Sequence, residues 1–166
     1  MPEPYTEPKA HDLRRRYVEA FGGDEFPVPV EAVAENLVGL AVERVAIGDC
    51  SGMLLPAERV ILVNPEEVET RQRFTIAHEL GHWICQCLEG TAEPVMCRDR
   101  DLSTAADRVR EREANVFAAE LLMPEEAVRA AHPYGSGAIR FGVSEEAMQW
   151  RRYSFGLRSD PPRRGS

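Results

Sequence analysis

Residues 74–83 of the chain read Phe-Thr-Ile-Ala-His-Glu-Leu-Gly-His-Trp and contain the pattern His-Glu-x-x-His. The run has the spacing of a helix, and residues four apart on a helix lie one above the other, about 6 Å along the axis. His78 and His82 can therefore direct their imidazoles at one point, where a single divalent ion fits. The pattern predicts a zinc-binding helix with one ion per chain.

Glu79 supplies the chemistry that this pattern implies. It follows His78 by one helical step of roughly 100°, so its carboxylate lies beside the metal position and not on it. A carboxylate there can hold a metal-bound water, whose pKa zinc lowers to about 7, take its proton and pass it to a leaving amine. We therefore expect Glu79 to be the general base of amide hydrolysis. For this pattern alone, the alternative is an amphipathic helix with two exposed histidines.

A catalytic zinc site of this kind needs a third protein ligand, and a long helix predicted over residues 104–123 can supply it. Glu111 lies on the inward stripe of that helix, one turn before its apolar part, where a carboxylate needs a cation. Glu113 points about 160° away and is the weaker candidate. A surface salt bridge of Glu111 with a neighbouring arginine is the other alternative. Asn115 lies where it could hydrogen-bond a ligating histidine.

Length, composition and charge limit the class of protein. The chain has 166 residues, 43% of them hydrophobic, and a formal net charge of −8. We expect one domain over residues 10–158, with a disordered tail at 1–9 and a flexible tail at 159–166. An acidic chain has no fold-wide basic surface, so direct nucleic-acid binding is not expected. The sequence shows neither a leader nor a membrane span, which predicts a cytoplasmic protein.

Three short extended runs precede the zinc-binding helix, at Leu40–Ile47, Ser51–Leu55 and Arg59–Val63. Turn residues separate them, which predicts an antiparallel meander. The expected fold class is α+β, with a small antiparallel three-stranded sheet packed on the His-Glu-x-x-His helix and further helices toward the C-terminus. A strand edge beside the zinc helix could bind an extended peptide through main-chain hydrogen bonds.

Two further expectations concern single positions. Gly81, inside the motif, costs about 1 kcal/mol relative to alanine in an exposed helix, so we expect a neighbouring backbone to approach it closely. Arg14, Arg15 and Arg16 are expected on the solvated face of an N-terminal helix, with an acid-binding patch as the alternative.

The four cysteines, Cys50, Cys85, Cys87 and Cys97, lack the spacing of a disulfide framework, and we expect free thiols. Cys85 follows His82 by three residues on the same helix face. A role as a further metal ligand is therefore the alternative to a core position.

Two longer stretches resemble the ImmA/IrrE family of zinc metallopeptidases. They are residues 71–83, around the His-Glu-x-x-His pattern, and residues 111–124, which begin Glu-Arg-Glu-Ala-Asn. Shorter likenesses occur at residues 51–52, 61–64 and 141–148. The resemblance implies that His78, His82 and Glu111 bind zinc and that Glu79 is the catalytic base. It also implies a pared-down thermolysin-type, or gluzincin, core.

For substrate, the resemblance implies a regulatory protein. Members of the family are often paired with a helix-turn-helix repressor or antitoxin, which they cleave, and this chain is similar to the short, phage-type members. Residues 83–87, Trp-Ile-Cys-Gln-Cys, depart from the aliphatic residues expected there.

A non-catalytic regulator, stabilised by zinc and binding DNA or a protein partner, is the alternative function. The last sixteen residues carry five arginines against one acid, which would suit a polyanion. A non-ligand Glu79 beside the predicted ligands favours catalysis, because a structural zinc site closes its fourth position with protein.

Overall fold

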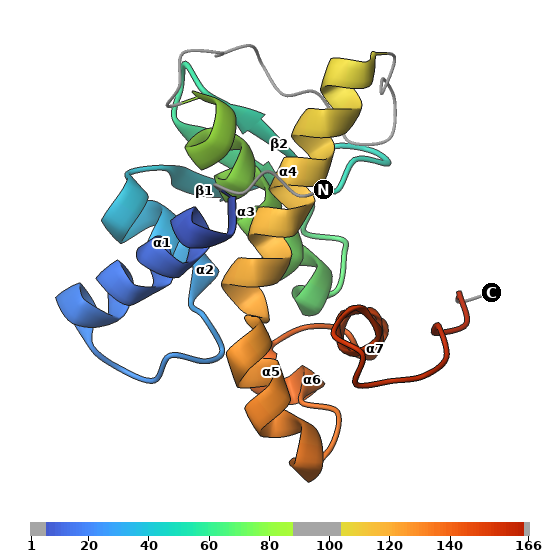
Figure 1. Ribbon diagram of the computed structural model, residues 1–166. Helices are drawn as coiled ribbons and strands as arrows, with labels where there is room; N and C mark the ends of the chain where they lie inside the picture. Colours follow the sequence, from blue (N-terminus) through green and yellow to red (C-terminus); the bar gives the residue numbers. More distant parts are fainter. Residues whose placement is uncertain (1–5, 88–103, 165–166) are drawn as a thin grey trace.

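The computed structural model describes residues 6–87 and 104–164, and within them the fold is α+β (Figure 1). The N-terminal elements are α1 (Thr6–Phe21), α2 (Val30–Ala32), the π-helical η1 (Val33–Val38), β1 (Ala41–Arg44), β2 (Gly52–Leu55) and β3 (Val60–Val63). The central pair is α3 (Glu69–His82), which continues as the π-helical η2 (Trp83–Cys87), and α4 (Ala105–Leu122). The C-terminal elements are α5 (Glu125–Ala131), the 3₁₀ turn η3 (His132–Tyr134), α6 (Ala138–Phe141) and α7 (Glu145–Ser154). The α+β class expected from the sequence is confirmed.

The sheet is mixed, so the predicted antiparallel meander is wrong. The strand order is β1-β3-β2, with β1 parallel and β2 antiparallel to β3. The Val-Ile-Leu-Val sequence of β3 is apolar throughout and takes the central place, where both of its edges are paired, whereas β1 is largely exposed. Residues 45–51 are long enough to carry the chain away from β1, so that β2 pairs with the strand that follows it.

The ends of the chain differ in part from the expected tails. Helix α1 begins at Thr6, so residues 6–9 are helical, and residues 1–5 lie outside the described ranges. Residues 159–164 form no helix or strand, yet Pro162 is buried. Within the part of the chain that the structure describes, no helix combines the length and the apolarity needed to cross a membrane.

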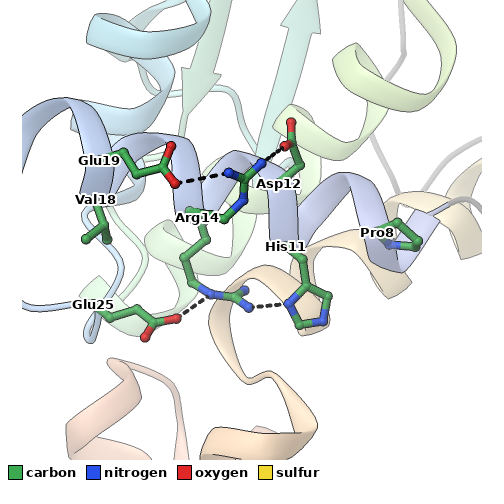
Figure 2. Close-up of a pocket in the computed structure, with 8 residues that line it drawn as sticks. Pro8, His11, Asp12, Arg14, Val18, Glu19 and Glu25 are labelled. Carbon is green, nitrogen blue, oxygen red and sulfur yellow. Dashed lines mark hydrogen bonds and ion pairs between the residues drawn. The ribbon is translucent and has the colours of Figure 1, made fainter.

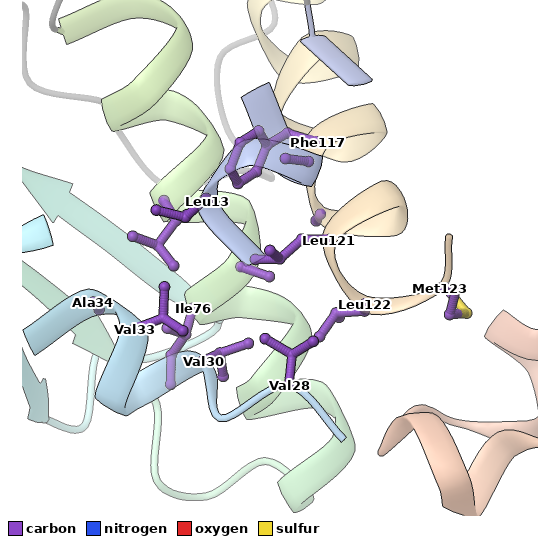
Figure 3. Packing of buried hydrophobic residues seen from close by; sticks show 14 of the residues in the cluster. Leu13, Val28, Val30, Val33, Ala34, Ile76, Phe117, Leu121, Leu122 and Met123 are labelled. Carbon is purple, nitrogen blue, oxygen red and sulfur yellow. The ribbon is translucent and has the colours of Figure 1, made fainter. Parts of the chain in front are cut away.

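Helix α3 lies between the sheet and α4 and is the centre of the core. All of its residues from Thr75 to His82 are buried. Toward the sheet, Gly52 of β2 leaves no room for a side chain because Thr75 of α3 packs directly against it. Figure 3 shows part of the surrounding cluster, to which α1 contributes Leu13 and α4 contributes Phe117. Helix α3 is therefore fixed on both sides by close packing.

The closest approach between α3 and α4 occurs at Gly81. A Cβ at this position would lie 3.0 Å from Cα and 3.1 Å from the carbonyl oxygen of Ala114, and 3.1 Å from Cβ of Phe117. The expectation that a neighbouring backbone approaches Gly81 is confirmed. This contact sets the distance between the helix that carries the two histidines and the helix that carries Glu111.

We predict that Gly81→Ala lowers the free energy of unfolding by about 1–3 kcal/mol, because the new methyl group is forced against the α4 backbone. Urea denaturation of the purified protein measures this change. Helix propensity alone would give the opposite sign, about 1 kcal/mol of stabilisation. A second substitution, Ala114→Gly, should not rescue the variant, because the clash is with backbone atoms of Ala114. A Gly81→Ala protein as stable as the wild type would contradict the close-contact account.

Arg14 ties α1 to the end of α4, so its predicted solvated position is wrong. Its side chain is only 6% exposed and donates to the carbonyl oxygens of Glu120 and Leu121, at 2.9 and 3.2 Å. The same guanidinium pairs with Glu25 at 2.9 Å and donates to Nδ1 of His11 at 2.7 Å, in the hollow that Figure 2 shows. Unpaired carbonyls at a helix C-terminus favour a cation, which explains the burial.

Candidate metal centre

The structure brings together His78, His82 and Glu111, as the sequence predicts. The Nε2 atoms of the two histidines are 3.1 Å apart. Glu111 reaches across from α4, with Oε1 2.9 Å from Nε2 of His82 and Oε2 3.1 Å from Nε2 of His78. Both imidazoles are 1% exposed, and the Glu111 side chain is 14% exposed. One carboxylate thus joins two buried imidazoles at the interface of α3 and α4.

These donors suit a zinc ion. Zinc takes imidazole nitrogen and carboxylate oxygen at about 2.0–2.2 Å, so two ligands of one tetrahedral ion lie roughly 3.3 Å apart. The three atoms of the cluster lie within 4.8 Å of one another, and the individual separations above are close to that spacing. Among the described residues, this is the group of histidine, cysteine and acidic side chains with the geometry to hold a metal ion.

Each histidine is held by a hydrogen bond at its other ring nitrogen. Nδ1 of His78 lies 2.9 Å from Oδ1 of Asn115, and Nδ1 of His82 lies 2.7 Å from Oε1 of Gln86. An amide oxygen accepts only, so each Nδ1 is the donor and each Nε2 is left for a ligand. The sequence predicted that Asn115 could hydrogen-bond one of the histidines, and its position agrees with this prediction. The hydrogen bond between His82 and Gln86 was not predicted.

A comparison with known proteins gives the family. The model of the IrrE N-terminal-like domain, a peptidase family, matches residues 42–152. The chain belongs to this family. The match begins in β1 and ends in α7, so it contains the sheet, both central helices and the whole histidine and glutamate cluster. The resemblance inferred from the motifs is confirmed.

Two curated relatives are radiation response metalloproteases named IrrE. The protein from Deinococcus radiodurans is 31% identical over 117 residues, which are 70% of this chain and 34% of the relative. The one from Deinococcus deserti is 30% identical over 126 residues, which are 75% of this chain and 44% of the relative. The chain therefore spans less than half the length of these relatives.

A solved structure has the same fold. A Mycobacterium tuberculosis transcriptional regulator matches 90% of this chain and 51% of its own with a TM-score of 0.62, at 22% identity. The likeness extends the shared architecture beyond the residues that the IrrE N-terminal-like model covers.

Gln86 owes its position to a change of helix type. Residues 83–87 form a π-helical turn directly after α3, and π-helical turns are frequent at functional sites. The buried Gln86 side chain accepts from His82 and donates to the carbonyl oxygen of Arg110 at 2.9 Å, with Oε2 of Glu113 at 3.5 Å. Glu113 is therefore half-buried beside Gln86 and not simply solvated. A polar residue four positions after His82 is the feature of the sequence that could have indicated this hydrogen bond.

We predict that Gln86→Met weakens zinc binding about 10- to 100-fold, because His82 loses the acceptor that orients its ring. Competition with a chromogenic chelator measures the affinity. Gln86→Glu keeps an acceptor and should bind zinc at least as tightly as the wild type. Gln149→Met, at a surface position of α7, is the matched control. Equal zinc affinity in Gln86→Met and this control would contradict the orienting role.

The metal-free cluster is an ion pair with opposite pKa shifts. Burial by itself would lower the pKa of His82, but the hydrogen bond to Glu111 and the nearby carboxylate charges raise it above its ordinary 6.5. Burial by itself would raise the pKa of Glu111, but the hydrogen bonds and charges of both histidines hold it well below its ordinary 4.5. Zinc must displace the proton from His82, so metal binding competes with protonation near neutral pH.

This pair predicts how stability of the metal-free protein depends on pH. The raised pKa of His82 gives stability that is present below 6.5 and lost as pH rises through the folded-state value. The lowered pKa of Glu111 gives stability that is present above 4.5 and lost as pH falls through its folded-state value. The melting temperatures of chelator-treated wild type and chelator-treated Glu111→Gln should therefore differ most between pH 4.5 and pH 6.5, the ordinary pKa values of the two groups. A difference that does not vary with pH would contradict the ion pair.

Glu79 follows His78 directly on α3. Glu79 is buried, and its negative charge contributes to the raised pKa of His82. The same charge, together with the larger effect of burial, raises the pKa of Cys87.

Cys85 is a buried thiol outside the histidine and glutamate cluster, so the alternative of a fourth ligand is not supported. Cys50 is disulfide-bonded, which contradicts the expectation of a free thiol there. Cys97 lies outside the described residues.

Proposed function

We propose that this protein is a zinc-dependent endopeptidase that acts in the cytoplasm. The observation that carries the proposal is the convergence of His78, His82 and Glu111 with a buried Glu79 one helical step away. A bound zinc ion would supply a Lewis acid that polarises the scissile carbonyl and acidifies water. Membership of a peptidase family supports this chemistry.

Glu79 is the proposed general base. It belongs to the same helix as the two histidines but points beside them, so it can accept a proton from water and return it to the leaving nitrogen. Asn115 and Gln86 hold the imidazoles by their Nδ1 atoms, which keeps both Nε2 atoms directed at one point. As the third ligand we propose Glu111 and not Glu113, because Glu111 contacts both histidines whereas the carboxylate of Glu113 lies near Gln86.

Four side chains carry a group that could donate a hydrogen bond to an oxyanion: His132, Tyr134, Tyr17 and Tyr153. His132 is hydrogen-bonded to Arg152, Tyr17 packs on Phe21, and Tyr153 packs on Trp150. Tyr134 is 90% exposed. These contacts agree with structural or surface positions for all four side chains.

The proposed substrate is a helix-turn-helix repressor or antitoxin. This inference rests on the resemblance to the ImmA/IrrE family. The names of the relatives support a regulatory setting, since two are radiation response proteases and one solved structure is a transcriptional regulator. Strand β2 could bind such a polypeptide, because it lies at one edge of the sheet and packs on α3.

The regulator hypothesis based on C-terminal arginines is weaker. Arg151 pairs with Glu120 at 2.6 Å and donates to the carbonyl oxygen of Met123 at 2.8 Å. Arg152 contacts His132, and Arg158 donates to Gln149. Three of the five arginines are thus engaged within the fold, and we do not advance polyanion binding as a second function.

We predict that Glu79→Gln retains zinc and the melting temperature of the zinc-loaded protein but loses cleavage by at least about 100-fold, because only the base is removed. The assay incubates the protein with candidate helix-turn-helix repressors and follows their fragments by mass spectrometry. Cleavage by Glu79→Gln at the wild-type rate would exclude this base.

Glu111→Gln and Glu113→Gln form a matched pair for the third ligand. Glu111→Gln should lose zinc during dialysis and melt at a lower temperature, because metal binding and folding are coupled. Glu113→Gln should keep about one zinc per chain, as the stoichiometry of a single site requires. Elemental analysis of both proteins measures the difference, and equal zinc content would refute the assignment of Glu111.

A further inference from the structure

Strand β2, at one edge of the described sheet, runs alongside the face of α3 that carries Glu79. At one end Gly52 packs directly against Thr75, because a Cβ on Gly52 would lie 2.3 Å from Cγ2 of Thr75. At the other end the hairpin turn after β2 places Arg59 over the ring of Trp83, with Cζ 5.9 Å from the ring centroid. Thr75, Glu79 and Trp83 are four residues apart and share one face of the helix. The strand edge therefore passes the level of Glu79 and ends in a turn that carries Arg59.

The lengths of the two elements agree with this alignment. The four residues of β2 rise about 10 Å, and the eight helical steps from Thr75 to Trp83 rise about 12 Å. The backbone N–H of Trp83 donates to the carbonyl oxygen of Glu79, so the four-residue spacing holds as far as Trp83. Trp83 and Arg59 thus lie about one helical turn beyond the proposed general base.

Arg59 presents a positive charge that the rest of the described chain does not pair. The residue is exposed, and within residues 6–87 and 104–164 its guanidinium makes no hydrogen bond and no ion pair. Its partner is the ring of Trp83, which is itself partly buried against the hydrophobic core. A guanidinium over an aromatic ring keeps the N–H groups at its edge for an acceptor. The donors of Arg59 are therefore available to a ligand.

The backbone of Arg59 indicates that its side chain has a use beyond the turn. Its φ is 54°, and in the part of the chain that the structure describes it is the one residue other than glycine with a positive φ. Glycine is favoured in this left-handed region, because a Cβ is crowded there. Residues held in such conformations cluster at functional sites. The turn carries an arginine where glycine would be the more stable choice.

We propose that Arg59, held over Trp83, binds a carboxylate of a polypeptide substrate that lies along β2. The inference rests on the proposed peptidase function and adds a preference for negative charge. Arginine pairs with a carboxylate through two parallel N–H donors, which suits an acidic side chain or the C-terminus of the substrate. An extended chain advances about 3.3 Å per residue, and Trp83 lies about 6 Å beyond Glu79 along α3. The carboxylate is therefore expected roughly two or three residues from the bond that is cleaved.

Cleavage of a peptide library by the zinc-loaded protein tests the inference. Peptides from a digested proteome are incubated with the protein, and the new termini are identified by mass spectrometry. The wild type should enrich Asp and Glu about two- to fivefold at one fixed position, as expected of an exposed ion pair. Cuts at a fixed distance from the peptide C-terminus, whatever residue stands there, would identify the terminal carboxylate as the bound group.

Two substitutions separate the charge of Arg59 from the turn. Arg59→Gly suits the φ of 54°, so this protein should melt no lower than the wild type and lose the preference. Arg59→Glu should reverse the preference and enrich Lys and Arg at the same position. Arg140→Glu is the matched control, because Arg140 of α6 is also exposed and its Cζ lies 5.9 Å from the ring centroid of Phe141. The control should keep the wild-type preference.

A profile without a charge preference would overturn the inference while leaving the peptidase function standing. So would a preference that persists in Arg59→Gly, or one that Arg59→Glu and Arg140→Glu change alike. If the wild type shows no zinc-dependent cleavage of any peptide, the proposed function itself is contradicted, and the inference with it.

Discussion

The contact of α3 with α4 at Gly81 is the constraint on which the rest of the structure depends. Without a side chain at this position, the backbone of Ala114 can approach α3 closely. Glu111 lies one turn earlier on α4 and is thereby placed at hydrogen-bond distance from both histidines. A wider helix pair would leave two buried imidazoles without their carboxylate, which is costly in an apolar interior.

Other contacts hold α4 in this position. Arg14 of α1 donates to the last carbonyl oxygens of α4, and the carboxylate of Glu120 pairs with His11 and with Arg151 of α7. The helix that presents Glu111 is thus anchored at its far end by α1 and α7. Removing one partner from such a buried network leaves uncompensated charge, so its effect would reach the metal centre through the position of α4.

A side-chain amide orients each of the two histidines of the cluster. Asn115 orients His78 from α4, while Gln86 orients His82 from the π-helical turn that follows α3. Both acceptors are uncharged amides, which fix the ring without adding to the negative charge of Glu79 and Glu111.

The sequence by itself determined what depends on helical periodicity. The spacing of His78 and His82, the choice of Glu111 over Glu113 as the residue nearest to them, and the close approach at Gly81 all follow from which residues share a helix face. Two motifs, at residues 71–83 and 111–124, also indicated the family to which the chain belongs.

Only the tertiary structure decided the pairings between segments distant in sequence. The order β1-β3-β2, the burial of Arg14 against the end of α4 and the disulfide state of Cys50 could not be inferred from local patterns. The physical reason is that hydrophobic periodicity and secondary-structure propensity each describe a single helix or strand. Strand order and buried polar partners depend on the path that brings separate elements together.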